Sequence, residues 1–353
     1  MIFDQFADMQ HASVMGRPTV DVLTGIDRVD RTEWQAVLSR GDSNVVFLTS
    51  EWQRAWWDAY GRGRLLLVTV RRDGELIALA SLFAEDGFIY FVGSGGSDYL
   101  DFIGDISCPQ VIDSLLLAAR SQVEDFIGFR FYLVPARSRT ADFLERAAER
   151  LGMEFCDEGE IEAPFLDLTA PGAAHAAVNK KSLLRHERFF ERAERIDVRE
   201  MRRSEDILPH LDDFFAQHVR RWESTEWPSP FLKERHRKFY RRLVGEASDA
   251  GWLRFTRIEW QGRAIAAHFG FCYNGSYLWY KPAFSIDLAR HSPGEVLLRR
   301  LLLSAIDEKA TTFDFGIGNE AFKQRFATAI PLVKTWALYA PGRQPSRNEG
   351  AIR

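Results

Sequence analysis

The chain has 353 residues, of which 46% are apolar and 27% are charged, and its formal net charge is −4. This is an ordinary soluble composition, long enough for two domains, and its charge gives no general attraction to nucleic acid or to an anionic membrane. Three widely spaced cysteines form no CxxC pair, so neither a disulfide framework nor a metal site is indicated. The sequence shows neither a signal-peptide pattern nor an apolar run of membrane-spanning length, which predicts a cytoplasmic location.

The first half opens with a polar lead-in and then mixes helices with strands. Helices are predicted at 50–60, 109–123 and 138–152, and strands at 64–70, 75–83, 88–93 and 128–134. Asp73-Gly74 is a strong hairpin signal between the first two strands. The glycine-rich loop 93–105 lacks the lysine of a P-loop and the spacing of a dinucleotide fingerprint, so we expect its Asp98 and Tyr99 to face a cleft instead.

The second half repeats this order. Helices are predicted at 204–222, 232–251, 292–310 and 319–326, and strands at 252–260, 264–273, 276–284, 311–317 and 332–339. In each half one crossover helix implies a local parallel or splayed strand pair, the kind of place where open sheets bind substrates. The predicted fold class is α+β (mixed α/β), with residues 1–170 and 201–353 as tandem domains and 171–200 as a linker with a basic helix.

Several segments carry a family resemblance. They are a helix end at His218-Val-Arg-Arg-Trp222, the strands AIAAHFGF and SYLWYKPAF, the helix start SPGEVLL, and FDFGIGNEAFKQRF at 313–326. This pattern resembles the GNAT acyl-CoA N-acyltransferase superfamily, and more closely the double-GNAT proteins of the CelD type, which are relatives of the FemABX transferases. The resemblance implies two tandem GNAT domains, the first degenerate as a CoA binder, and acetyl-CoA or a longer acyl-CoA as the donor.

The helix start at 291–302 is the predicted donor site. Ser292 suits the N-cap and Pro293 the first helical position, and free N–H groups at that end would attract a pyrophosphate. In GNAT proteins this junction holds the CoA pyrophosphate, while the preceding strand holds the pantetheine arm. The resemblance therefore assigns donor binding to a set of residues around the junction, namely His291, Ser292, Gly294, Glu295, Val296 and Lys281. An ordinary capped core helix is the alternative.

Three side chains are candidates for moving protons. His268 shares a strand face with two small residues, and a histidine titrates near neutral pH, although a satisfied core histidine is the alternative. Asp314 shares a face with Gly316, as in a cleft wall, and could act as a general base or could anchor the following turn. Tyr280 could protonate a departing thiolate, or could be a core aromatic.

Acceptor binding is predicted at the cleft. Lys323, with Glu320 one turn earlier, could close over the acceptor or could form an exposed ion pair, and FemABX relatives use a lysine at a comparable place for an anionic acceptor. Trp222 and Trp227 could stack on a sugar, line an acyl groove or plug the seam between the domains. Asp98 and Tyr99 would contribute from the first half.

One helix in the linker carries a basic stripe. Its cations recur at 4-3-4-3 spacing, at Lys181, Arg185, Arg188, Arg192 and Arg195. Because glutamates lie between these cations, a solvated helix face on which the charges pair with one another is the expected structure. A dock for CoA phosphates, for an anionic sugar polymer or for a lipid surface is the functional alternative.

The resemblance implies direct attack of an amine on a thioester, without a covalent enzyme intermediate. The acceptor would be a small-molecule, glycan or lipid amine, such as an amino-sugar precursor of exopolysaccharide or the cell envelope, with a peripheral membrane or biosynthetic-complex contact left open. Two alternatives remain. One is a FemABX-like transfer from aminoacyl-tRNA, against which the non-basic overall charge argues, and the other is a non-catalytic GNAT-fold effector in polysaccharide biosynthesis.

Overall fold

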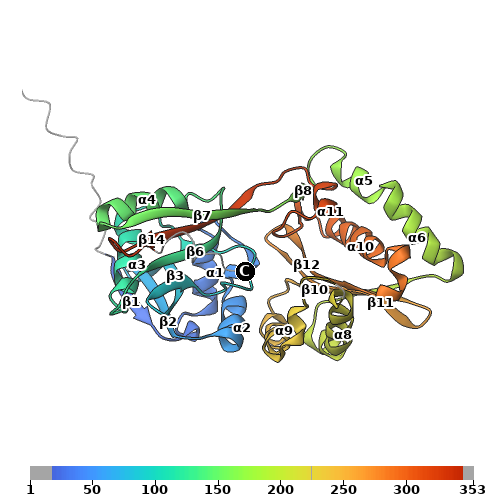
Figure 1. Cartoon of the computed structure of the whole chain (residues 1–353), viewed down its shortest axis with the longest axis horizontal. Helices are drawn as coiled ribbons and strands as arrows, with labels where there is room; N and C mark the ends of the chain where they lie inside the picture. Colours follow the sequence, from blue (N-terminus) through green and yellow to red (C-terminus); the bar gives the residue numbers. More distant parts are fainter. Residues whose placement is uncertain (1–17, 224, 345–353) are drawn as a thin grey trace, which may run out of the picture.

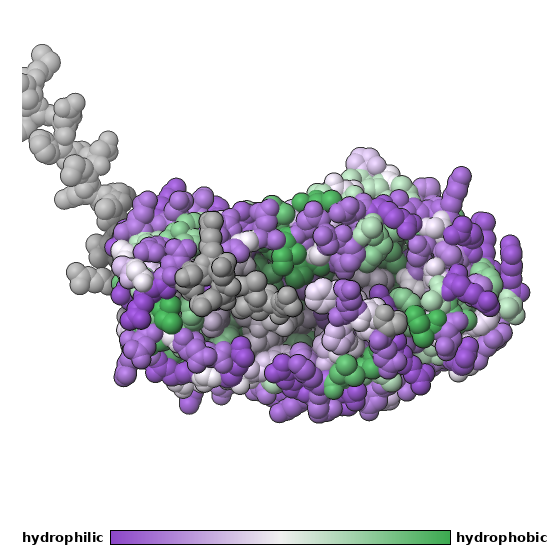
Figure 2. Space-filling view, viewed as in Figure 1, coloured by the Kyte–Doolittle hydropathy of each residue, from purple (hydrophilic) through white to green (hydrophobic). Residues whose placement is uncertain are grey.

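The computed structural model of the chain describes residues 18–223 and 225–344. They form two halves side by side, each a mixed sheet flanked by helices (Figure 1). This confirms the predicted fold class. The face of the molecule seen in Figure 2 is mostly hydrophilic, with smaller hydrophobic patches, some of them where the two halves meet. Within the described residues, no helix combines the length and the apolar character that crossing a membrane requires.

The first sheet runs in the order β1–β2–β3–β4–β6–β14–β7, with β5 paired to β3. Its strands are β1 (Thr19–Leu23), β2 (Arg64–Arg72), β3 (Glu75–Glu85), β4 (Phe88–Phe91), β5 (Ile103–Gly104), β6 (Gly128–Pro135), β7 (Glu154–Glu162) and β14 (Leu332–Tyr339). All neighbours are antiparallel except β4 and β6, which flank the crossover helix of this half.

The second sheet runs in the order β8–β13–β12–β11–β10–β9. Its strands are β8 (Phe165–Asp167), β9 (Asp197–Met201), β10 (Leu253–Trp260), β11 (Arg263–Tyr273), β12 (Ser276–Phe284) and β13 (Thr312–Asp314). β12 and β13 are its parallel pair, and all the other neighbours are antiparallel. The parallel pair predicted at each crossover is therefore present in both halves.

Helices cover both sheets. They are α1 (Arg31–Leu38), α2 (Ser50–Tyr60), α3 (Pro109–Arg120), α4 (Thr140–Leu151), α5 (Ala173–Val178), α6 (Lys181–Ala193), α7 (Ser204–Ile207), α8 (Leu211–Trp222), α9 (Glu234–Ala247), α10 (Pro293–Asp307) and α11 (Ala321–Gln324). α10 packs on β11 and β12, with α5 and α6 outside it, and α2 packs against α9 between the two halves (Figure 1).

The chain exchanges strands between the halves. β14 was expected to complete the second half, but it lies between β6 and β7 in the first sheet, while β8 from the end of the first half pairs with β13 in the second sheet. The prediction for β14 was wrong because strand order depends on pairing between distant segments, which local patterning does not encode. The domain limits at 170 and 201 stay a prediction.

Two further expectations are corrected. The lead-in contains β1 and α1, and α1 buries the side chains of Trp34 and Leu38 after an N-cap at Asp30, whose carboxylate accepts from the Thr32 N–H at 2.8 Å. The helix predicted at 204–222 is interrupted at Pro209 by a 3-10 turn, because proline has no N–H to donate and its ring crowds the preceding turn.

One hydrophobic cluster continues from the first half into the second. Trp52 on α2 is fully buried, and its ring lies 5.1 Å from that of Phe239 on α9 and 5.8 Å from that of Tyr280 on β12. Such edge-on aromatic contacts stabilise the packing beyond the effect of the buried apolar area. This packing places the glycine-rich loop of the first half directly against β12.

The position of β14 predicts a stability effect in the first half from a residue near the end of the chain. Leu338 is fully buried between β6 and β7, so Leu338→Ala should lower the free energy of unfolding by about 2–5 kcal/mol in urea titrations. Hydrogen exchange should show the loss of protection in β6 and β7.

Thr335→Ala, at a half-buried position of the same strand, serves as the control. Lost protection in β10–β13 that spares β6 and β7 would contradict the assignment.

Candidate active site

The parallel pairing of β12 and β13 ends early. It covers three residue pairs, the last of them Leu278 beside Asp314. β12 continues to Phe284, whereas the chain after β13 turns away at Gly316, where φ is 68°. The two strands therefore diverge, and residues 279–284 have no strand partner on that side in the described part of the chain. A free strand edge of this kind can hydrogen-bond an extended ligand.

The first half contributes a carboxylate to this opening. A Cβ at Gly316 would lie 2.5 Å from Oδ2 of Asp98 and 3.7 Å from the carbonyl oxygen of Trp279, so the glycine makes room for the aspartate. Burial raises the pKa of Asp98, while the charges of Lys281 and Lys323 act in the opposite direction. Asp98 was expected at the cleft, and the structure places it inside the opening.

A cavity of about 580 Å³ adjoins the opening and is called the larger cavity below. Its walls are mainly apolar, with the rings of Trp222, Trp279 and Phe284 among them. Its charged or titratable lining residues are Asp98, His218, Arg221, Lys281, Glu295, Glu320 and Lys323. Apolar walls with a few polar groups are typical of small-molecule sites.

The two lysines of the larger cavity differ in their contacts. Lys323 is 4% exposed, donates to the carbonyl of Ile317 at 2.6 Å and pairs with Glu320 at 2.8 Å. Lys281 lies with Nζ 4.2 Å from the ring centroid of Tyr280 and has no hydrogen bond or ion pair with the rest of the described chain. Burial lowers the pKa of Lys281, and Asp98 partly restores it. Of the two lysines, Lys281 is thus the one left for a ligand.

Arg221 forms another part of this wall. Its Nη1 donates to the carbonyl of Pro282 at 2.8 Å, and its guanidinium lies 4.3 Å from the ring centroid of Phe284. Burial lowers the pKa of Arg221 to about 10. The predicted neighbours Trp222 and Trp227 also line the larger cavity, and Trp227 is 70% exposed at its rim.

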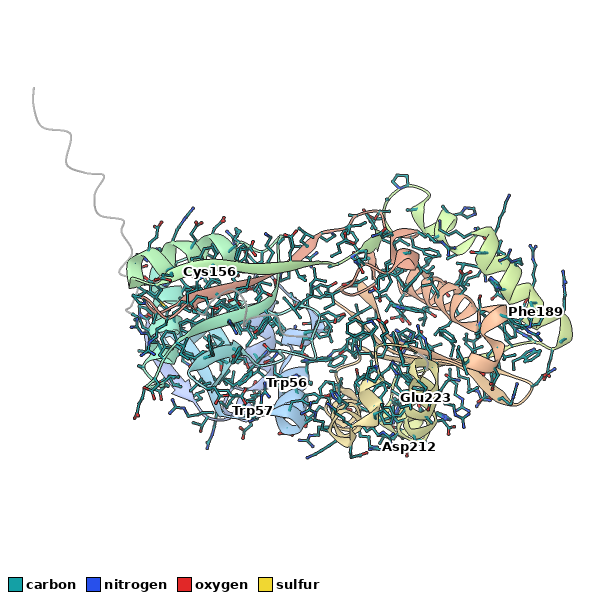
Figure 3. The ribbon with its side chains drawn as sticks, in the orientation of Figure 1. Trp56, Trp57, Cys156, Phe189, Asp212 and Glu223 are labelled. Carbon is teal, nitrogen blue, oxygen red and sulfur yellow. The ribbon has the colours of Figure 1, made fainter. Side chains whose placement is uncertain are left out.

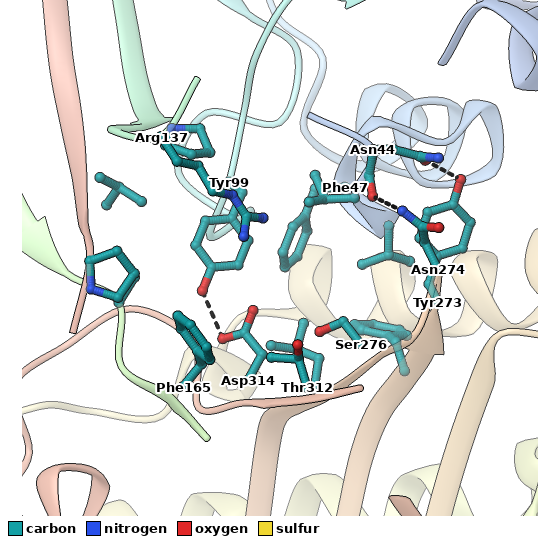
Figure 4. Close-up of a pocket in the computed structure, with 18 of the residues that line it drawn as sticks. Asn44, Phe47, Tyr99, Arg137, Phe165, Tyr273, Asn274, Ser276, Thr312 and Asp314 are labelled. Atoms are coloured by element: carbon teal, nitrogen blue, oxygen red, sulfur yellow. Dashed lines mark hydrogen bonds between the residues drawn. The ribbon is translucent and has the colours of Figure 1, made fainter. Parts of the chain in front are cut away.

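A second, smaller cavity of about 250 Å³ lies on the other side of Tyr99. Both halves line it, and Figure 4 shows Asp314 below Tyr99 with Arg137 above. Neighbouring residues separate the two cavities, because Asp98 lines the larger and Tyr99 the smaller, and Phe315 lines the larger and Asp314 the smaller. The two cavities therefore adjoin at these residues.

Asp314 is the carboxylate of the smaller cavity. It accepts from the Tyr99 hydroxyl at 2.7 Å and from the Gly316 N–H at 2.8 Å (Figure 4). Burial raises its pKa to about 6, even though both hydrogen bonds favour the charged form. A carboxylate with this pKa is mostly ionised at neutral pH and can accept a proton. It both holds the turn and borders a cavity.

His268 lies elsewhere. It is fully buried, lines neither cavity and accepts from the backbone N–H of Tyr280 at 3.0 Å through Nε2. Burial lowers its pKa to about 3. The contact also occupies an N–H of β12 that could otherwise polarise a carbonyl. The Tyr280 side chain lines the larger cavity, but its hydroxyl already donates to the carbonyl of Gly96 at 2.6 Å.

The start of α10 offers few groups to a pyrophosphate. The Ser292 carbonyl accepts from the N–H groups of Glu295 at 3.0 Å and of Val296 at 3.4 Å, and Pro293 has no N–H. Only Gly294 among the first helical residues keeps a free N–H, and it lines the larger cavity.

The side chains at this helix start do not favour an anion either. His291 stacks on Phe189, with ring centroids 3.6 Å apart, and accepts from Nε of Arg290 at 2.8 Å. Phe189 lies on α6 at the outer edge of the molecule (Figure 3). Glu295 places a carboxylate in the first turn, 3.3 Å from Arg325. These residues do not fit a pyrophosphate, whereas residues 279–284 of β12 have no strand partner on the side of β13 in the described chain.

Sequence reasoning missed several lining residues. Arg137 follows β6 without any motif, and Ser276, Thr312 and Asn44 also line the smaller cavity. Arg221 belongs to the segment 218–222, but the sequence predicts no role for this arginine. Isolated polar residues at strand ends give no local signal, so only the meeting of the two halves shows that they belong together.

Residues 178–324 match the sequence family described as the acetyltransferase (GNAT) domain. Among curated proteins, none has a significant match to the chain.

Solved structures resemble nearly the whole chain. The crystal structure of FemX is similar with a TM-score of 0.62 and 12% identity, over 88% of this chain and 96% of that one. L-PGS from Bacillus licheniformis has a TM-score of 0.57 and 15% identity, over 89% and 92%. A tandem GNAT protein from the clavulanic acid biosynthesis pathway has a TM-score of 0.53 and 11% identity, over 94% and 100%. At these identities the likeness concerns the fold, which is a tandem GNAT fold.

The raised pKa of Asp314 predicts the sign of a pH effect on stability. Between about pH 4 and pH 6 the folded chain keeps a proton that the unfolded chain has released, so this contribution to stability falls as the pH rises. Asp314→Asn removes the titration. Its unfolding free energy relative to the unmodified chain should rise by about 1–3 kcal/mol from pH 4 to pH 7.5, measured by urea unfolding.

Asp105→Asn is the control, because hydrogen bonds from Ser107 lower the pKa of Asp105, so its titration lies below this pH range and its relative free energy should stay nearly constant. A relative free energy for Asp314→Asn that stays flat or falls over this range would show that the carboxylate is not destabilised by burial.

Proposed function

We propose that this protein is an N-acyltransferase. An activated acyl donor enters the larger cavity along the free edge of β12, and an amine in the smaller cavity attacks it. The observation that carries the proposal is the position of Asp314, at the last residue pair before β12 and β13 diverge, with a pKa close to neutral. A group able to take a proton from an amine thus stands beside the opening through which a donor would reach it.

The transfer needs no covalent enzyme intermediate. The lone pair of the amine nitrogen attacks the carbonyl carbon, the C–N bond forms, and the carbonyl π electrons move to oxygen. The C–N bond stays when the intermediate collapses, and the bond to sulfur or oxygen of the donor breaks with its electron pair. Asp314 takes one proton from the ammonium form of the amine before attack, and the second proton that the nitrogen loses as the amide forms passes to the leaving group. The unpaired ammonium of Lys281 stabilises the negative charge on the carbonyl oxygen.

The finer identity of the substrates rests on the sequence. Acetyl-CoA or a longer acyl-CoA is the donor that the family resemblance implies, and the free strand edge supports it. The resemblance also implies an amino-sugar acceptor from exopolysaccharide or envelope biosynthesis, in a CelD-type, cytoplasmic setting. Of the residues that the sequence predicted for the donor, Lys281, Gly294 and Glu295 line the larger cavity, and His291, Ser292 and Val296 line neither cavity. Of those predicted for the acceptor, Tyr99 lines the smaller cavity. Asp98, Trp222, Trp227 and Lys323 line the larger one, so in this proposal they contact the donor.

An aminoacyl ester of tRNA is a second candidate donor, and two observations favour it. The start of α10 does not fit a pyrophosphate. In addition, Glu187 of α6 is buried and pairs with Arg299 and Arg300 of α10 at 2.5 Å, and Glu191 pairs with Arg300 at 3.1 Å. The basic stripe on α6 consequently has no carboxylate partner among the residues described here, and unpaired cations favour phosphate contacts.

A transfer assay separates these donors. The chain is incubated with pooled amines and, in turn, acetyl-CoA, lauroyl-CoA and charged tRNA, and amide products are detected by mass spectrometry. Asp314→Asn should lower kcat/KM by about 10²–10⁴-fold, the usual effect of losing a general base. Asp125→Asn, an exposed carboxylate outside both cavities, should leave the rate unchanged.

Calorimetry with each acyl-CoA and filter binding with charged tRNA report the donor independently of turnover. The proposal would be overturned if neither donor binds and cells that carry Asp314→Asn behave like cells with the unmodified protein. Those results would favour a non-catalytic effector.

A further inference from the structure

The smaller cavity has a simple charge pattern. Arg137 and Asp314 are the charged residues among those that line it, and every other lining residue is neutral. They come from different halves, because Arg137 follows β6 and Asp314 ends β13. In Figure 4 the Arg137 side chain reaches toward the ring of Tyr99, whose hydroxyl contacts Asp314. One positive and one negative group thus border a single small space.

The Arg137 side chain has no hydrogen-bond or ion-pair partner in the part of the chain that the structure describes, although its charge favours the ionised form of Asp314. Neither a hydrogen bond nor an ion pair joins it to any residue of 18–223 or 225–344, whereas Arg139, two positions on, pairs with Asp42 through contacts of 2.7 and 2.9 Å. An arginine carries a planar fork of donors that matches a carboxylate in two-point contact. An unpaired arginine at a cavity wall is therefore a ready site for a carboxylate.

The neutral lining fits a small polar molecule. The hydroxyls of Ser276 and Thr312 border the cavity and are free to bond a ligand, since neither has a side-chain partner in the described chain. The Asn44 side chain is already held, because Oδ1 accepts from the Tyr273 hydroxyl at 2.7 Å. A volume of about 250 Å³ suits a molecule of amino-acid size.

We propose that the smaller cavity binds a small amine that also carries a carboxylate, with the carboxylate on Arg137 and the amine on Asp314. Its meaning for catalysis rests on the proposed function, in which this amine is the acceptor. The product would be an N-acylated acid. The bound ammonium gives one proton to Asp314 before attack, and the second proton lost from nitrogen as the amide forms balances the one that the leaving group gains.

Two kinds of molecule share this chemistry, namely a free α-amino acid and an amino sugar bearing a carboxylate, such as muramic acid. Glucosamine has the amine without the carboxylate and would leave Arg137 unpaired. A carboxylate-bearing acceptor therefore separates this inference from the plain amino sugar that the sequence resemblance implies.

The test measures binding without any acyl donor. Saturation-transfer NMR on the full-length chain screens the standard L-amino acids, muramic acid and glucosamine, and calorimetry follows for each binder and its carboxamide. Removing the carboxylate as the amide, or its partner by Arg137→Ala, should each weaken binding by about 10–100-fold, and Arg137→Lys should lose less. Arg146→Ala removes an exposed arginine of the same half outside the cavity, and should bind like the unmodified chain.

Equal affinity for acid and carboxamide, normal binding by Arg137→Ala, or binding of glucosamine alone would overturn the inference. A failure of the proposed function would give another result. The chain would then bind an amino acid or muramic acid through Arg137 but would form no amide with any donor. Arg137 lies at an exposed position, so its variants should fold, and the urea midpoint of each verifies this.

Discussion

The insertion of β14 between β6 and β7 is the constraint on which the site depends. The chain crosses between the halves near 163–165 and again near 329–331, and the two crossings are joined by hydrogen bonds of 2.8 Å from the Ala163 N–H to Pro331 and of 3.0 Å from the Phe165 N–H to Ala329. Because the last strand belongs to the first sheet, the chain connects the two sheets at two adjacent places. Residues 215 positions apart, Tyr99 and Asp314, meet as a consequence.

The buried charges at this junction are arranged for a ligand more than for stability. Asp98 and Asp314 both have raised pKa values because burial opposes their ionisation, and Lys281 has a lowered pKa for the same reason. Ion pairs within the fold would relieve this cost, yet the Lys281 side chain has none in the described chain. Electrostatic cost that the fold leaves uncompensated is typical of functional sites, since a substrate or transition state can relieve it.

Glycine 316 connects the backbone to this chemistry. Its positive φ turns the chain away from β12, and the missing side chain gives Asp98 its place. In contrast, a Cβ at Gly294 would lie 3.1 Å from the ring of Phe284. The absence of a side chain at Gly294 therefore lets α10 pack closely against β12. Gly316 and Gly294 thus have different roles, because different segments pack against them.

The sequence by itself determined most of the local structure and the fold class. Turn dipeptides, alternating strands and capped helix starts are short-range signals, so the hairpins, the crossover helices and the placing of Asp98, Tyr99, Asp314 and Lys281 near a cleft could be predicted. Only the tertiary structure decided the exchange of β14, the pairing of Glu187 on α6 with α10, the burial of His268 and the position of Arg137 at the smaller cavity. Each of these depends on contacts between residues far apart in the chain, and no local pattern carries that information.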